Sequence, residues 1–156
     1  MDEPNDDNVL EVLSSHNAQV GSLTVRRALP QRRRRTVGAW CFADHMGPAD
    51  VTEGSGLDIG PHPHTGLQTV TWLIDGQALH RDSLGSEQVI SSGELNLMTA
   101  GRGVSHAEEA TGHYRGTCRA SNSGSRRTTH HASVRRDSST TEICPASIWA
   151  RRPRLY

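Results

Sequence analysis

The stretch IGPHPHTGLQTVTWLIDG, residues 59–76, places a His-Pro-His triplet directly before a run of β-branched and aromatic residues. The run LQTVTWLI is typical of a β-strand, because Val, Ile, Thr and Trp favour an extended backbone. Side chains alternate faces along a strand, so we expect His62 and His64 on one side, roughly 6–7 Å apart. Pro63 between them lacks a backbone donor and stiffens the chain. Two interpretations stay open from this fragment: half of a metal site, or a pair of solvated loop histidines.

Turn residues divide the surrounding sequence into short extended segments. The segment TVGAWCFADHMGP (residues 36–48) indicates a strand that runs into a Gly-Pro turn. Asp75-Gly76 favours a hairpin turn, because glycine accepts positive φ angles. The runs QALHRDS, LGSEQVI and LNLMTAGRGVSHAEE follow, with turn residues between them. Short strands repeated every 8–12 residues or so predict an all-β sandwich or barrel.

Composition limits the partners and the location of the protein. The 156-residue chain has 17 basic and 17 acidic residues, and every basic residue is Arg. This balance predicts no nucleic-acid partner, and the run Arg32–Arg35 is interpreted as an exposed loop. Cys41, Cys118 and Cys144 show no CxxC spacing, which argues against a disulfide framework or a cysteine zinc site. There is no long apolar segment and no secretory signal, so we expect no membrane contact and a cytoplasmic location.

A second candidate half-site lies in TAGRGVSHAEEA, where Gly101 and Gly103 lead into His106 and Glu108. On an extended backbone His106 and Glu108 share a face, which repeats the spacing of the first histidine pair. Two such pairs on facing strands of a small barrel could converge on one ion. Three imidazoles and one carboxylate suit Fe(II), with Mn, Co, Ni or Zn as competitors.

The sequence strongly resembles the N-terminal half of the pirin family, a branch of the cupin superfamily. The resemblance covers residues 24–113 and rests on VGAWCFADHMGP, GPHPHTGLQTVTWLIDGQALHRDSLG and MTAGRGVSHAEE. It implies a cupin-type double-stranded β-helix, or jelly-roll, barrel. It also implies that His62, His64, His106 and Glu108 hold a divalent metal cation, most often Fe(II). Gln68 stands where pirins usually have Glu, which changes a charge near the metal and puts rate and substrate choice in question.

The resemblance implies oxidative ring opening of a quercetin-like flavonol with O2, as in a quercetin 2,3-dioxygenase. Glu108, or a water beside it, is the candidate base that removes the substrate proton, so Glu108 would be both ligand and base. Two alternatives stay open. One is a non-enzymatic, iron-binding regulatory protein that responds to the redox state of the metal. The other is an inactive, truncated pirin whose barrel is incomplete at its C-terminal end.

Composition and hydrophobic pattern predict three parts of the chain: a disordered segment over 1–20, a pirin-like cupin domain over 21–114, and an unstructured tail over 115–156. The tail is rich in Arg, Ser and Thr and follows neither strand nor helix periodicity. One set of GC-rich codons for residues 117–125, read in a shifted frame, translates to LQGVQLWV, which resembles the strand that pirins have here. We therefore predict a frameshift near residue 117, which the nucleotides across codons 110–150 would test.

Single residues near these motifs have simpler interpretations. We interpret His45 as a structural histidine rather than a neighbour of the metal, and His80 as a cross-strand or surface residue. Trp40 and Trp72 are expected in the core rather than as stacking platforms for a flavonol. Cys41 is expected to be a buried small residue.

Overall fold

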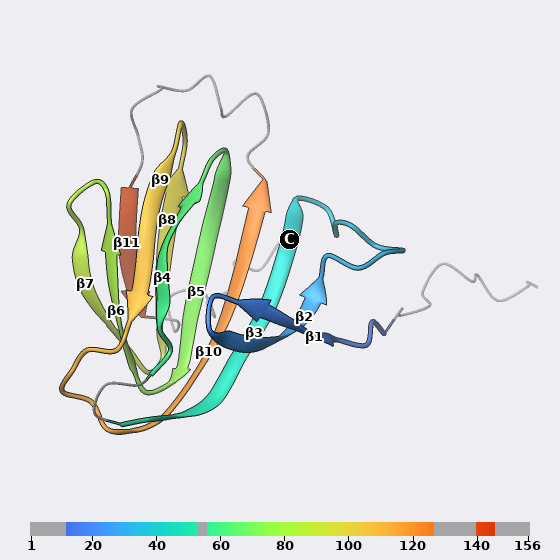
Figure 1. The fold of residues 1–156 in the computed structure, drawn as a ribbon. Helices are drawn as coiled ribbons and strands as arrows, with labels where there is room; N and C mark the ends of the chain where they lie inside the picture. The colour runs from blue at the N-terminus through green and yellow to red at the C-terminus, as the bar shows by residue number, and fades with distance from the viewer. Residues whose placement is uncertain (1–11, 53–55, 127–139, 146–156) are drawn as a thin grey trace, which may run out of the picture.

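The computed structural model describes residues 12–52, 56–126 and 140–145. Every regular element in these residues is a β-strand (Figure 1). The strands are β1 (His16–Val20), β2 (Leu23–Leu29), β3 (Trp40–Val51), β4 (Ile59–His64), β5 (Leu67–Asp75), β6 (Gln77–Asp82), β7 (Glu87–Ser91), β8 (Glu94–Ala100), β9 (Val104–Glu109), β10 (Gly116–Arg126) and β11 (Thr140–Pro145). Within the described ranges no helix is long and apolar enough to span a membrane.

Two antiparallel sheets form the walls of a barrel (Figure 1). The larger sheet has the order β1-β2-β3-β10-β5-β8-β11, and the smaller sheet has the order β4-β9-β6-β7. The chain passes repeatedly from one sheet to the other, so neighbours in a sheet are often far apart in sequence. The all-β barrel expected from the short strands and their turns is confirmed.

The alternation along β5 shows how the sequence builds this barrel. Thr69, Thr71 and Leu73 are buried, whereas Trp72 between them is 44% exposed. Leu73 packs in the main core with side chains from both sheets, namely Val25, Met46, Val51, Leu57, Ile59, Ala78, Ile90, Cys118 and Ala120. One face of the strand therefore supplies the apolar interior and, at Thr71, a polar group inside the barrel.

The Asp75-Gly76 turn joins β5 to β6, but these strands belong to different sheets and do not pair. The expected hairpin is therefore wrong, and the turn is a corner between the two walls. Gly76 has a φ of 92°, and a Cβ there would lie 3.0 Å from the Cα of Cys118. The corner thus needs glycine for both its backbone conformation and its close packing. A hairpin within one sheet does join β6 to β7.

The expected division into disordered ends and a middle domain is wrong for several described residues. Residues 16–20 form β1, and residues 116–126 form β10, which lies between β3 and β5 in the larger sheet. Residues 140–145 form β11 beside β8. Composition missed these strands because backbone pairing with neighbours requires no apolar pattern. The rest of both predicted ends, residues 1–11, 127–139 and 146–156, lies outside the described residues.

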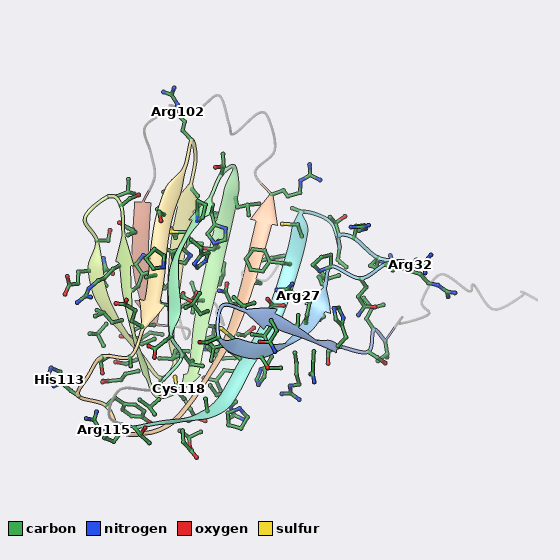
Figure 2. All side chains as sticks on the ribbon, viewed as in Figure 1. Arg27, Arg32, Arg102, His113, Arg115 and Cys118 are labelled. Carbon is green, nitrogen blue, oxygen red and sulfur yellow. The ribbon has the colours of Figure 1, made fainter. Side chains whose placement is uncertain are left out.

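Trp40 and Trp72 are at the surface rather than in the core, since their exposed fractions are 42% and 44%. Trp72 lies on the face of β5 opposite to the buried Thr71 and Leu73, as strand alternation requires. Cys41 is only partly buried, and its Sγ donates to the carbonyl of Gly124 at 3.3 Å. Arg32 and its three Arg neighbours lie on the exposed loop that was expected (Figure 2).

Candidate metal centre

The pairing of β4 with β9 brings the two sequence motifs together. His62 lies directly opposite His106, and His64 lies opposite Val104, with an irregularity in register between Ile59 and His62. The ring centroids of His62 and His106 are 4.4 Å apart, and that of His64 is 4.9 Å from His62 and 5.0 Å from His106. One ligand atom from each of the three rings lies within 4.8 Å of the others.

Hydrogen bonds indicate which ring nitrogens face the centre. Nδ1 of His62 lies 3.0 Å from the carbonyl oxygen of Gly60, so this nitrogen carries the proton and Nε2 keeps its lone pair. His106 is 2% exposed, and its Nε2 is buried without a hydrogen-bond partner in the described structure. A buried nitrogen of this kind costs free energy unless a ligand satisfies it.

Glu108 supplies a carboxylate beside these rings. Its Oε1 accepts a 2.5 Å hydrogen bond from Oγ1 of Thr71 on β5, and its Oε2 is buried with no partner in the described structure. Glu108 forms a second possible metal-holding group with His106 and His80, all three buried. The two groups share His106, and Glu108 is grouped with His80 and His106 rather than with His62 and His64.

Burial shifts the protonation of these groups. The pKa of His106 is lowered to about 3, mainly because the ring is buried and also because His62, His64 and His80 lie close by. Burial and then the neighbouring His62 lower the pKa of His64. Burial raises the pKa of Glu108, although the hydrogen bond from Thr71 opposes this shift. At neutral pH His64 and His106 are thus neutral and keep the lone pairs that a metal ion needs.

The sequence interpretation underestimated His80. It lies cross-strand to Glu108, as one alternative held, but it is fully buried rather than on the surface. Its ring centroid is 5.1 Å from that of His106. The signal was present in the alternation of β6, where Ala78 and His80 are buried and Leu79 and Arg81 are less so.

Gln68 and His45, which the sequence also singled out, lie outside the two possible metal-holding groups. Gln68 is half-buried on β5, and its Nε2 donates to Oγ1 of Thr99 at 3.0 Å. His45 lies on β3, paired across the strands with Arg26 and Ser121, and neither possible metal-holding group in the described residues contains it. Burial and the nearby Arg26 lower the pKa of His45.

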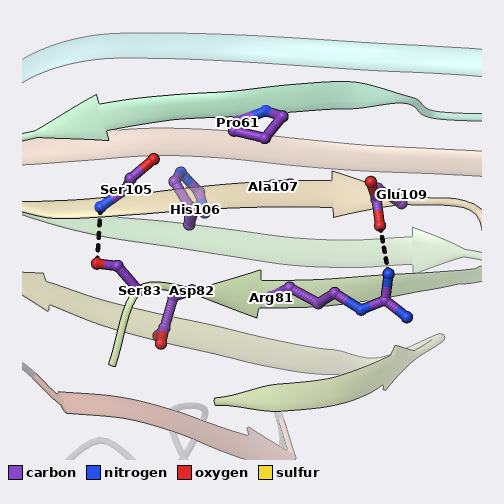
Figure 3. Close-up of a pocket in the computed structure, with 8 residues that line it drawn as sticks. All are labelled: Pro61, Arg81, Asp82, Ser83, Ser105, His106, Ala107 and Glu109. Carbon is purple, nitrogen blue, oxygen red and sulfur yellow. Dashed lines mark hydrogen bonds and ion pairs between the residues drawn. The ribbon is translucent and has the colours of Figure 1, made fainter. Parts of the chain in front are cut away.

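A pocket of about 290 Å³ lies against β4, β6 and β9 (Figure 3). Ser105, Ala107 and Glu109 line it, and these residues alternate along β9 with His106 and Glu108. The pocket therefore belongs mainly to the face of β9 that the metal-ligand candidates do not use.

An antiparallel barrel with a histidine-rich interior defines a cupin-type protein with a candidate metal centre. The Pirin family model matches residues 22–122 of this chain. The chain therefore belongs to the pirin family. The match extends through the first half of β10, beyond residue 113, where the resemblance seen in the sequence ends.

Relatives agree with this assignment. The chain is 55% identical over 105 residues to a Pseudomonas aeruginosa protein provisionally named a quercetin 2,3-dioxygenase, covering 67% of this chain and 33% of the relative. It is 45% identical over 103 residues to a pirin-like protein of Caulobacter vibrioides, covering 65% of this chain and 36% of that protein. The chain thus spans about a third of the length of these relatives.

A solved structure supports the cupin-type fold directly. The crystal structure of a quercetin 2,3-dioxygenase from Acinetobacter baumannii superposes with a TM-score of 0.75 and 44% sequence identity. The superposition covers 84% of this chain and 43% of that protein. The expected cupin-type barrel is therefore confirmed.

Proposed function

We propose that this chain binds one divalent metal cation, Fe(II) in the cell, and serves the oxidative ring opening of quercetin-like flavonols by O2. The observation that carries the proposal is the convergence of His62, His64 and His106 within the barrel, with Glu108 beside them. The names of the Pseudomonas and Acinetobacter relatives supply the substrate class.

The donor set fits such an ion. His106 Nε2 and Glu108 Oε2 are buried polar atoms without partners in the described structure, and both lie in the region where the ligands would meet. Three imidazoles and one carboxylate are suited to Fe(II) and to its divalent competitors. A bound Fe(II) would supply the Lewis acid and redox chemistry of the reaction.

The protein groups would handle the proton of the substrate. Burial raises the pKa of Glu108, so this carboxylate takes up a proton more readily than an exposed one. We place the proton from a flavonol hydroxyl on the Glu108 carboxylate, whose Oε1 also accepts from the hydroxyl of Thr71. Buried His106 excludes water from one side of the site.

A cytoplasmic location also belongs to this proposal. Cys41 and Cys118 are unpaired in the described residues, as expected in a reducing compartment. This chain spans about a third of its relatives' length, so we infer the substrates of the whole protein from the names of those relatives.

The first test is metal content per folded monomer of the 156-residue chain after loading with Fe(II) under anaerobic conditions. We expect about one iron per chain in the parent and a large loss in His64→Ala. The control is His113→Ala, which removes an exposed histidine remote from the site (Figure 2). Iron retained in His64→Ala, or absent from folded parent protein, would contradict the metal site.

The second test is oxygen uptake with quercetin by the iron-loaded chain. Glu108→Gln keeps the shape of the side chain and its hydrogen bond with Thr71 but removes the base. We expect its rate to fall by roughly 10²–10⁴-fold, the usual contribution of a general base. Iron binding without any turnover in the parent would instead favour the non-enzymatic regulatory alternative.

A further inference from the structure

Two buried residues outside the proposed ligand set lie directly behind His106. They are His80 and Asp82 on β6, whose side chains have no exposed surface. Because β6 pairs with β9, His80 lies opposite Glu108, and Asp82 lies opposite His106. Both residues therefore lie beside the proposed ligands His106 and Glu108.

Contacts on the other face of the sheet maintain this register (Figure 3). The backbone N–H of Ser83 donates to the carbonyl of Ser105 at 2.8 Å, and the N–H of Ser105 donates to Oγ of Ser83 at 3.1 Å. At the other end Arg81 and Glu109 form an ion pair at 3.1 Å. These cross-strand contacts hold the end of β6 against β9.

A chain of close contacts connects Asp82 to His106 through His80. Oδ2 of Asp82 is 3.3 Å from Nε2 of His80, and Nδ1 of His80 is 3.4 Å from Nδ1 of His106. Nδ2 of Asn96 also lies 3.1 Å from Nδ1 of His80. The other oxygen of Asp82 accepts hydrogen bonds from the backbone N–H groups of Leu84 and Ser86, which fixes the carboxylate.

The chemistry of these groups sets the direction of every hydrogen bond. An ionised carboxylate can only accept, so Nε2 of His80 carries a proton and donates to Asp82. Nδ1 of His80 faces the amide N–H₂ of Asn96 and therefore accepts. His106 then donates from its own Nδ1, and its Nε2 is left unprotonated. This is the nitrogen that is buried without a partner in the described structure.

We infer that Asp82 and His80 are positioning residues that hold the proton of His106 on Nδ1 and so leave Nε2 free for a metal ion. The inference rests on the proposed metal site, which it deepens. Groups of this kind behind a ligating histidine fix its tautomer and its orientation, and their loss typically lowers metal affinity 10–100-fold.

Asp82→Asn tests the direction of the hydrogen bonds from Asp82 to His106 with little change in the shape of the side chain. The amide oxygen can keep the two backbone hydrogen bonds, which leaves the amide N–H₂ facing Nε2 of His80. Nε2 must then accept, so the proton of His80 moves to Nδ1. The Asn96 amide must then turn its N–H₂ away from Nδ1, and the Nδ1 proton is donated toward His106. Nδ1 of His106 becomes the acceptor, and its proton moves to Nε2, where it blocks the metal ligand. The number of protons on the two rings does not change.

Long-range ¹H–¹⁵N NMR of the metal-free, full-length chain reports which ring nitrogen of His106 carries the proton. We expect Nδ1–H in the parent and Nε2–H in Asp82→Asn. The same tautomer in both proteins would overturn the inference. A purely structural role for Asp82 would not exchange the two nitrogens.

Calorimetric titration with Ni²⁺ alone then connects the tautomer to binding. We expect roughly 10–100-fold weaker binding in Asp82→Asn than in the parent. His62→Ala serves as a control that removes a proposed ligand but keeps the Nδ1–H tautomer of His106. An exchanged tautomer with unchanged Ni²⁺ affinity would overturn the inference. A parent with the expected tautomer but no Ni²⁺ binding would overturn the proposed metal site instead and leave the hydrogen-bond chain intact.

A second pair of variants covers the case in which Asp82→Asn does not fold. Gln at position 80 offers an amide N–H₂ for Asp82 and an amide oxygen for His106, whereas Leu offers neither. We expect His80→Gln to keep the Nδ1–H tautomer and more of the Ni²⁺ affinity than His80→Leu. Equal Ni²⁺ affinities in these two variants would overturn the inference.

Discussion

Strands β5 and β10 lie side by side in the larger sheet, but their sequences differ sharply. They pair from Asp75 opposite Arg119 to Leu67 opposite Arg126. The sequence of β5, LQTVTWLID, is typical of a strand, whereas that of β10, GTCRASNSGSR, resembles a loop. Both strands nevertheless bury alternate residues, in β10 through small side chains at Cys118, Ala120 and Gly124.

The difference shows that a strand between two others can form without an apolar pattern. β10 pairs with β3 on one side and β5 on the other, so both edges of its backbone are hydrogen-bonded. Small residues suffice on its inner face, because larger side chains of β3 fill the space. A Cβ at Gly124 would clash with the ring of Phe42. In β5, by contrast, the side chains themselves make the core.

The largest expected effect comes from removing β10. A chain that ends at Arg115 leaves β3 and β5 without a shared partner, and its free energy of unfolding should fall to about zero. A chain that ends at Arg126 keeps β10 and removes β11. Circular dichroism and NMR dispersion should show a folded barrel only in the longer chain. A folded barrel in the shorter chain would mean that β10 adds nothing to stability.

The next largest effects should come from core substitutions, which compare how much the side chains of β5 and β10 contribute to stability. Leu73→Ala on β5 removes a fully buried large side chain and should lower the free energy of unfolding by about 2–5 kcal/mol. Cys118→Ala on β10 removes only a sulfur atom from the same core and should cost about 1 kcal/mol. Urea unfolding measures both values. Equal losses would show that β10 also depends on its side chains.

Gly124→Ala tests whether β10 requires a residue without a side chain at this position. The added methyl group would meet the ring of Phe42, which stacks on His64 with centroids 6.2 Å apart. We expect a loss of about 1–3 kcal/mol in stability and weaker Ni²⁺ binding, because the displaced Phe42 disturbs His64. Ser123→Ala, at the neighbouring position, is the control. Unchanged Ni²⁺ affinity in Gly124→Ala would show that the position of Phe42 does not affect metal binding.

Thr71 of β5 and Asn122 of β10 lie directly opposite each other, but only Thr71 is bonded to Glu108. That hydrogen bond lowers the pKa of Glu108 against the effect of burial. Thr71→Val should therefore raise this pKa further, and Ni²⁺ binding that needs the carboxylate should move to higher pH. ¹³C NMR of the Glu108 carboxyl measures the shift. Asn122→Ala should leave it unchanged, and an equal shift in both variants would show that the hydrogen bond is not its cause.

The smallest expected effect is at Gln68, which lies opposite Ser125 of β10. Gln68→Glu restores the residue that pirins usually have, and its carboxylate can still accept from the Thr99 hydroxyl. We expect the free energy of unfolding to change by less than about 0.5 kcal/mol. We expect the rate of oxygen uptake with quercetin to change only slightly, because Gln68 lies on the same face of β5 as Trp72, opposite to the buried Thr71. An unchanged rate would remove Gln68 from consideration as a specificity residue.

The sequence alone was sufficient for the all-β class and the cupin-type barrel, and it singled out three histidines that the structure brings together, His62, His64 and His106. The alternation of His62 with His64, and of His106 with Glu108, depends only on strand geometry, which is local. Strong β propensity in segments such as β5 made these strands visible as well.

Only the tertiary structure decided the sheet to which each strand belongs, and therefore what surrounds the site. Asp75-Gly76 looks like a hairpin, but packing against Cys118 makes it a corner between sheets. β10 has no visible pattern, because its stability comes from the backbones of β3 and β5. In the sequence His80 has no feature that distinguishes it from other strand histidines; the pairing of β6 with β9 places it beside His106. Contacts between residues distant in the chain depend on pairing and burial, and these are properties of the whole barrel.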